Sequence, residues 1–112
     1  MKDKIKVITK YPNQVAGSYK TIDNTLGALQ KIVGGYIEVI TAQYDPELLI
    51  ICNEEGKLQG LEQSFIIADQ NGNVLDSIHG PVIVCGADGE DFDDVPITVD
   101  EWHKMLWNWG NT

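Results

Sequence analysis

The sequence predicts a small single domain of the α+β class, with a mixed or antiparallel sheet and two helices, one after strand 1 and one C-terminal. Its length of 112 residues is that of one compact core. Hydrophobic residues make up 43% of the chain and charged residues 22%, as in ordinary globular domains. Short apolar runs bounded by turn residues outnumber the segments with helical periodicity. We therefore expect residues 1–112 to fold as one unit.

The first strand is predicted from the alternation of apolar and polar side chains at residues 5–7. We expect it to end before residues 11–13 and to be followed by a loop through Gly17.

A helix is predicted next, because apolar side chains recur at three- and four-residue spacing over residues 26–33. Asp23 or Asn24 is expected to cap its N-terminus, and the Gly34-Gly35 pair to end it.

Two further strands follow this helix. Residues 36–41 alternate and are β-branched, and residues 45–46, Asp-Pro, separate them from an unbroken apolar run at 48–52. Such a run is typical of a central strand with both faces covered. Residues 53–56 then form a turn, in which we expect Gly56 to adopt a positive φ.

A β-hairpin is predicted in the second half of the chain, where apolar residues 65–67 and 74–75 flank an Asn-Gly pair at 71–72. Residues 82–85 are expected to form another buried strand.

The C-terminal segment begins with an acidic loop over residues 88–94. Thr98 and Glu101 then match a capping box, which predicts a helix that runs toward Gly110. Four apolar side chains share one face of this helix and are expected to be buried: Trp102, Met105, Leu106 and Trp109. Trp107 lies off that face, so we expect it to be exposed and to contact a partner or a second copy of the chain.

The charge balance disfavours direct binding of nucleic acid. The sequence has 8 basic residues, all lysine, against 17 acidic ones, for a net charge of -9. No apolar run approaches the roughly 20 residues of a membrane-spanning helix. We expect a cytoplasmic protein of a bacterial host, with Cys52 and Cys85 reduced and buried.

The acidic segment is the main candidate for partner binding. Three interpretations fit such a cluster: a solvated loop, a surface that docks a basic protein, and a calcium site. Its carboxylates are Asp88, Glu90, Asp91, Asp93 and Asp94.

A small-ligand pocket is the alternative site. It would lie around the turn at residues 53–60 and hold a nucleotide if Lys57 and Lys31 converged. Its candidate residues are Tyr36, Asn53, Glu54, Glu55 and Lys57.

Catalytic and metal-binding motifs are not found in the sequence. The two histidines, His79 and His103, and the two cysteines do not fall within two to five residues of one another, as zinc ligands would. Neither the P-loop nor the dinucleotide-binding glycine pattern is present. We expect no cofactor, no metal and no enzymatic activity.

Two blocks of sequence resemble the family known as domain of unknown function 3846. The first is Val33-Gly34-Gly35-Tyr36-Ile37-Glu38, after Leu26, Leu29 and Gln30; the second is Cys52-Asn53-Glu54-Glu55-Gly56-Lys57-Leu58, before Gly60-Leu61. The pattern continues with Ile78-His79-Gly80 and with Gly89-Glu90-Asp91-Phe92, so that the resemblance covers roughly residues 22–101.

One position departs from the family pattern. After Gly60-Leu61 the family usually has a proline and an Asn-Arg pair, whereas this chain has Glu62-Gln63-Ser64-Phe65, so no role of that arginine carries over. The resemblance implies an origin in phages, plasmids or conjugative elements and implies no chemistry.

Two functions are therefore expected. The first is a small acidic, non-catalytic interaction protein of a phage or mobile genetic element, an anti-defence inhibitor that binds a basic surface of a host protein. The alternative is a small-ligand-binding protein that sequesters a nucleotide signal. Association into a homo-oligomer through the C-terminal helix is compatible with both.

Overall fold

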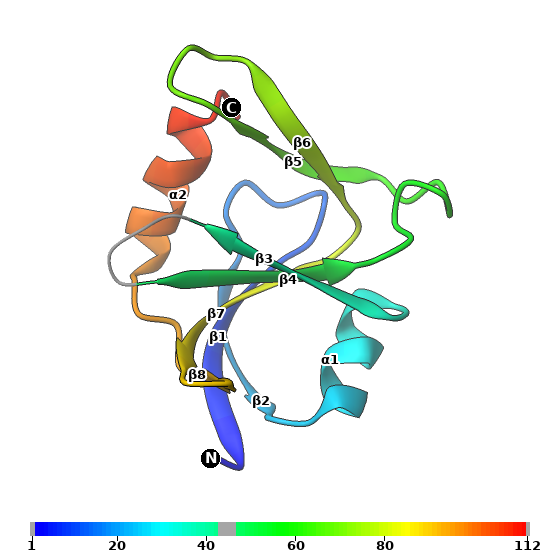
Figure 1. Cartoon of the computed structure of the whole chain (residues 1–112), viewed down its shortest axis with the longest axis vertical. Coiled ribbons are helices and arrows are strands. Elements are labelled where there is room, and N and C mark those ends of the chain that lie inside the picture. The colour runs from blue at the N-terminus through cyan, green and yellow to red at the C-terminus, as the bar shows by residue number, and fades with distance from the viewer. Residues whose placement is uncertain (1, 43–46, 112) are drawn as a thin grey trace.

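The computed structural model describes residues 2–42 and 47–111, so the predicted Asp-Pro break at 45–46 lies outside the described residues. The elements are β1 (Lys4–Lys10), β2 (Ser18–Asp23), α1 (Leu26–Val33), β3 (Ile37–Ala42), β4 (Leu48–Asn53), β5 (Gln63–Ala68), β6 (Val74–His79), β7 (Val82–Asp88), β8 (Asp91–Asp93) and α2 (Val99–Asn108). The larger sheet has the order β2-β1-β7-β4-β3, with β8 paired to the end of β7, and β5 and β6 form a separate hairpin (Figure 1). Every strand pair in the larger sheet and in the β5–β6 hairpin is antiparallel, which confirms the α+β class.

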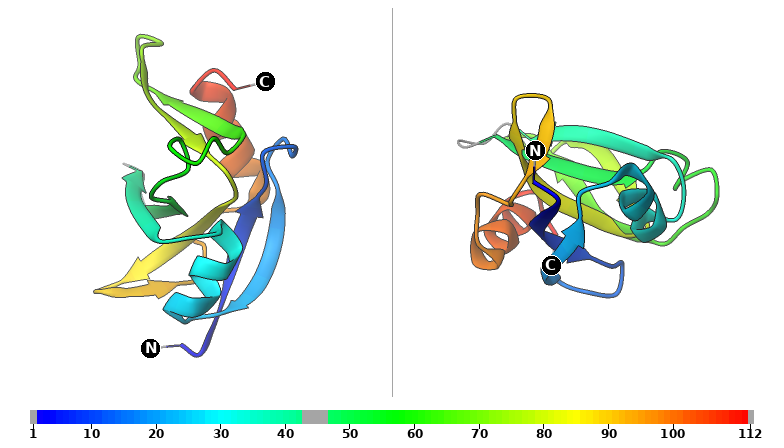
Figure 2. Two further views of the ribbon diagram at one scale, coloured as in Figure 1. Left: turned by 90° about the vertical axis from the view of Figure 1, so that its right-hand side faces the viewer. Right: turned by 90° about the horizontal axis from the view of Figure 1, so that it is seen from below.

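The larger sheet is covered on both faces. On one face Val7, Ile51 and Ile83 pack with Leu29 and Val33 of α1. Helix α1 and helix α2 are separated from each other in both views of Figure 2.

The other face carries the second hydrophobic cluster. Ile8 pairs with Val84, which pairs with Ile50, and all three pack in one cluster with Phe65 of β5 and Trp102 of α2. Every residue of β4 is buried, which confirms that this unbroken apolar run forms a central strand.

Strand β2 lies where the sequence predicts only a loop. Ile22 is its one buried residue, because β2 is an edge strand and most of its side chains face solvent. Helix α1 therefore follows the second strand and not the first. The cap was also wrong: the Thr25 side chain accepts from the Ala28 amide, whereas Asn24 bonds elsewhere.

The acidic segment is a hairpin and not a loop. Strand β7 continues to Asp88, and β8 returns beside it, with Gly86 opposite Asp93 and Asp88 opposite Asp91. Gly89 turns the chain at a φ of +63°. Charged side chains are compatible with strands here because the hairpin projects from the sheet and its side chains reach water.

Outside the acidic segment, the elements of the C-terminal half agree with the predictions. The β5–β6 hairpin forms, and Thr98 and Glu101 make the capping box of α2. Trp102 is fully buried, and its indole Nε1–H donates to the Ala16 carbonyl at 3.0 Å. In the described part of the chain, neither helix has the length and apolarity that a membrane crossing requires.

Candidate functional site

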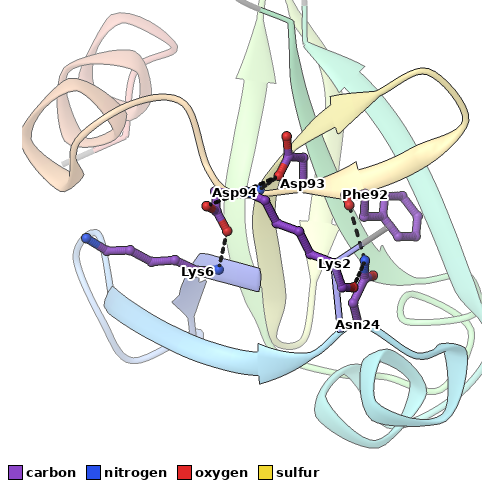
Figure 3. Close-up of polar contacts among 6 residues, drawn as sticks. All are labelled: Lys2, Lys6, Asn24, Phe92, Asp93 and Asp94. Atoms are coloured by element: carbon purple, nitrogen blue, oxygen red, sulfur yellow. Dashed lines mark hydrogen bonds and ion pairs between the residues drawn. The ribbon is translucent and has the colours of Figure 1, made fainter. Parts of the chain in front are cut away.

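The acidic hairpin, meaning β7, the turn at residues 89–90 and β8, is tied to the start of the chain. Lys2 Nζ lies 2.8 Å from Asp93 Oδ1 and 2.8 Å from Asp94 Oδ2. The other Asp94 oxygen, Oδ1, accepts from the Lys6 amide at 2.8 Å. Figure 3 shows both aspartates beside the N-terminal segment. Asp94 thus links the end of the hairpin to β1.

Asn24 makes a second link at the same place. Its side-chain amide donates to the Lys2 carbonyl at 3.0 Å and to the Phe92 carbonyl at 3.2 Å (Figure 3). Because Asn24 directly precedes the Thr25 cap of α1, one side chain joins the N-terminus, the helix start and the acidic hairpin. This explains why Asn24 does not itself cap the helix.

The ionisation of Asp93 and Asp94 is stabilised by these contacts. Hydrogen bonds from the Lys2 ammonium hold the pKa of both carboxyls below their usual range, and main-chain amides lower each pKa further. The same two carboxylates raise the pKa of Lys2. Two of the five predicted partner-binding carboxylates are therefore already engaged within the chain.

The remaining three, Asp88, Glu90 and Asp91, are exposed. Within residues 2–42 and 47–111 the structure has no ion pair to any of them. The five acidic residues thus divide into a pair that anchors the hairpin and a group of three that faces water.

A groove of about 210 Å³ lies between the acidic hairpin and the start of α1. Leu26 in this groove is 58% exposed, although its helical spacing predicted a place in the core. Its lining residues are Asn24, Thr25, Leu26, Leu29, Glu90, Asp91 and Phe92. We call it the hairpin groove; it combines apolar side chains with two of the exposed carboxylates.

Sequence reasoning missed Leu26 and Phe92 as members of this site. Leu26 is the first residue of α1, and Phe92 lies in β8, which pairs with β7. Nothing in the local sequence signals that these two segments meet. Only the antiparallel return of β8 places Phe92 near the start of α1.

Trp107 is 66% exposed, as the sequence predicted, but it does not line the hairpin groove. It lies on α2, which packs on the opposite face of the sheet from α1. Its role in partner binding or self-association stays a prediction.

The alternative ligand residues are distributed over two depressions. Tyr36 and Glu55 line one of about 250 Å³, and Glu54 and Lys57 line another of about 320 Å³. Asn53 borders both, but its amide is occupied: Nδ2 donates to Val33 O at 3.2 Å and to Gln59 Oε1 at 3.3 Å, and Oδ1 accepts from the Glu55 amide at 2.8 Å.

The lysine pair that a nucleotide would need is not assembled. Lys57 Nζ forms an ion pair with Asp76 at 2.6 Å. Lys31 lines a different groove, along β2, together with Lys4 and Lys20. Lys57 and Lys31 therefore do not converge, although a nucleotide site here would require it.

Gly56 serves a different purpose from the one expected. It is not among the glycines with positive φ. Instead, a Cβ at this position would lie 2.6 Å from the main-chain oxygen of His79. Gly56 allows the turn at residues 54–60 to lie directly against β6.

The two thiols are buried and unbonded, as expected. Burial raises the pKa of Cys52 and of Cys85 to about 12, so neither is a thiolate at neutral pH. Among the residues that the structure describes, no three His, Cys, Asp or Glu side chains gather closely enough to hold a metal ion.

Comparison with known proteins places the chain in a family. A family model described as Domain of unknown function (DUF3846) matches residues 5–106, which extends the resemblance at residues 22–101 in both directions. Searches of curated proteins and of solved structures found no match. The chain therefore belongs to the family described as Domain of unknown function (DUF3846).

Proposed function

We propose that this protein acts by binding a basic surface of another protein through its acidic hairpin and the hairpin groove. The observation that carries the proposal is the division among the five carboxylates. Asp93 and Asp94 hold the hairpin on the N-terminal strand, while Asp88, Glu90 and Asp91 remain exposed. Glu90 and Asp91 line the hairpin groove together with Leu26.

A surface of this composition favours a partner with interspersed cations and apolar side chains. Fixed carboxylates attract lysine and arginine over a distance and orient the approach of the partner. An exposed leucine in a shallow apolar groove supplies contact area at short range. The net charge of -9 adds a general attraction for basic proteins and a general repulsion of nucleic acid.

The resemblance to small proteins of phages and plasmids suggests what kind of protein this partner is. A nuclease or another nucleic-acid-binding protein of a bacterial host has a basic groove for phosphates. An acidic hairpin that occupies this groove would block it, which is how an anti-defence inhibitor would work.

The nucleotide-sequestering alternative has less support. The Lys57 ammonium is paired with Asp76, and Glu38 and Glu54 line the same depression, so an anionic ligand would meet an excess of negative charge.

The test is a comparison of charge-matched variants. Wild-type protein is immobilised and exposed to bacterial lysate at about 50 mM and about 300 mM salt, and retained proteins are identified by mass spectrometry. A triple variant, Asp88→Asn with Glu90→Gln and Asp91→Asn, removes the exposed charges. The control removes three charges elsewhere: Glu54→Gln, Glu55→Gln and Glu62→Gln, all exposed positions.

We expect wild type and the control to retain the same basic protein at low salt and the triple variant to lose it. Leu26→Gln should also weaken retention, because it removes the apolar contact without changing the charge. Equal retention by the triple variant and the control would refute the proposal.

A further inference from the structure

A second polar site lies in the depression of about 320 Å³ that Glu54 and Lys57 line, between the turn at residues 54–60 and strand β6. We call this depression the cleft. The side chains in its lining that carry a charge or a nucleophile are Glu38, Glu54, Lys57, Asp76, Ser77 and His79. The proposed partner surface involves none of them. Nothing in the sequence singles out Ser77, because Ser77 and His79 match no catalytic motif.

Ser77 and His79 are in direct hydrogen-bond contact. The Ser77 Oγ lies 3.1 Å from Nε2 of His79, and Nδ1 of His79 lies 2.9 Å from the main-chain oxygen of Leu61. Residues two apart on a strand point to the same side, which brings the two side chains together on β6. Both are half-buried and line the cleft.

The Leu61 carbonyl decides which ring nitrogen carries the proton. A carbonyl oxygen only accepts hydrogen bonds, so a neutral His79 has its proton on Nδ1 and its lone pair on Nε2. The Ser77 hydroxyl then donates to Nε2. A nucleophile, a base and a group that orients the base are thus joined in one chain of contacts.

The backbone around His79 is fixed from two sides. The turn approaches so closely at Gly56 that a Cβ there would meet the main-chain oxygen of His79 at 2.6 Å. On the other side, Gly80 has a φ of +86°, and its amide donates to the Glu62 carbonyl at 2.8 Å. The imidazole is therefore held between packed segments and does not lie on a free loop.

We propose that Ser77 and His79 are a catalytic pair that hydrolyses small esters carrying a protonated amine. In the first step the Ser77 Oγ attacks the ester carbonyl carbon while His79 Nε2 takes the hydroxyl proton. The bond from this carbon to the alcohol oxygen breaks, the alcohol leaves with the proton from His79, and an acyl-serine remains. Water then attacks the acyl carbon while His79 Nε2 takes one of its protons. The bond from this carbon to Ser77 Oγ breaks, Oγ takes the proton from His79, and the acid is released.

The candidate donors for the developing oxyanion belong to residues that line the same cleft. The Lys57 ammonium, paired with Asp76, lines it, and Asp76 is the residue before Ser77. In the described ranges, the main-chain amides of Lys57 and Leu58 donate to no protein acceptor, and both residues line the cleft. Charge and amide donors are the groups that stabilise such an intermediate.

The charge of the cleft sets the substrate class. Glu38, Glu54 and Asp76 provide three carboxylates against the single ammonium of Lys57. This excess of negative charge favours a substrate with a cationic group and disfavours an anionic one.

The first test is labelling with a fluorophosphonate, which reacts with serines activated by a base. Intact-mass and peptide analysis of the full chain should show one adduct, on Ser77. Ser77→Ala should remove the labelling, and the control Ser18→Ala, on the exposed face of β2, should keep it. His79→Gln should slow labelling by about 100-fold or more. Absence of an adduct on the wild-type chain, or unchanged labelling of Ser77→Ala, overturns the proposal.

The second test compares substrates. The p-nitrophenyl ester of lysine should be hydrolysed about tenfold faster than p-nitrophenyl hemisuccinate at low salt, and Glu38→Gln should narrow this ratio. The triple variant of the acidic hairpin should hydrolyse both esters at the wild-type rate. Faster hydrolysis of the anionic ester, or no Ser77-dependent hydrolysis of either, contradicts the assignment.

Discussion

Asn111 occupies the position that a neighbouring strand would take beside Ile66. The Ile66 amide donates to Asn111 Oδ1 at 2.9 Å, and Asn111 Nδ2 donates to the Ile66 carbonyl at 2.9 Å. The same Nδ2 donates to the Leu106 carbonyl at 2.9 Å. A single side chain therefore closes the open edge of β5 and joins it to the end of α2.

Asn111→Ala should lower the free energy of unfolding by about 1 to 3 kcal/mol, because it leaves the two main-chain groups of Ile66 without protein partners. Urea denaturation followed by tryptophan fluorescence measures this. The control is Asn108→Ala, at an exposed position of α2. A loss no larger than that of the control would show that water replaces the Asn111 contacts without cost.

Gly56→Ala should destabilise the fold by about 1 to 3 kcal/mol, since its Cβ would lie 2.6 Å from the main-chain oxygen of His79. Gly27→Ala is the matched control, because a Cβ there has nothing within 4 Å and the residue is helical. It should stabilise by up to about 1 kcal/mol. Thermal unfolding of the two variants should therefore shift in opposite directions, and equal shifts would be inconsistent with the close packing at Gly56.

The stability of the acidic hairpin should depend on pH through Asp93 and Asp94. Their pKa values are lower in the folded chain than the ordinary 3.8, so their contribution is present above about that pH and is lost as pH falls through the folded values. Asp93→Asn with Asp94→Asn should thus be less stable than wild type at neutral pH, with the difference vanishing in acid.

Because Asp94 is half-exposed, this difference should be small and should shrink with added salt. Denaturation midpoints at several pH values measure it. Asp91→Asn serves as the comparison and should leave the stability at neutral pH nearly unchanged, since Asp91 has no described ion pair. A difference that stays constant from neutral pH to a pH below the folded pKa values of both carboxyls would contradict the assignment.

Cys52 and Cys85 should not react with a thiol reagent in the folded protein at pH 8. Burial raises the pKa of each to about 12, which leaves almost no thiolate. Ellman's reagent should therefore modify two thiols only after the chain is unfolded in guanidinium. Rapid reaction of one thiol in buffer would mean that its strand opens locally.

The sequence predicts the elements that have a clear apolar pattern, either periodic or unbroken, and does not predict those that lack one. The apolar run at residues 48–52 and the apolar face of the C-terminal helix that contains Trp102 and Leu106 indicate burial from the sequence alone. Strand β2 has a single buried residue, Ile22, so its sequence has no apolar alternation that would indicate a strand. Strand β8 could not be predicted, because two of its three residues are aspartates and clustered carboxylates usually indicate a loop.

The properties of the candidate sites likewise fall into those that the sequence determines and those that the tertiary structure decides. The sequence alone determined that the chain is acidic, that its carboxylates cluster at residues 88–94 and that Trp107 is exposed, because composition and local periodicity express these properties directly. Tertiary structure decided which carboxylates are free, that Leu26 and Phe92 share a groove, and that the Leu61 carbonyl orients His79 beside Ser77. Each of these depends on contacts between segments far apart in the chain, and no local pattern encodes such a contact.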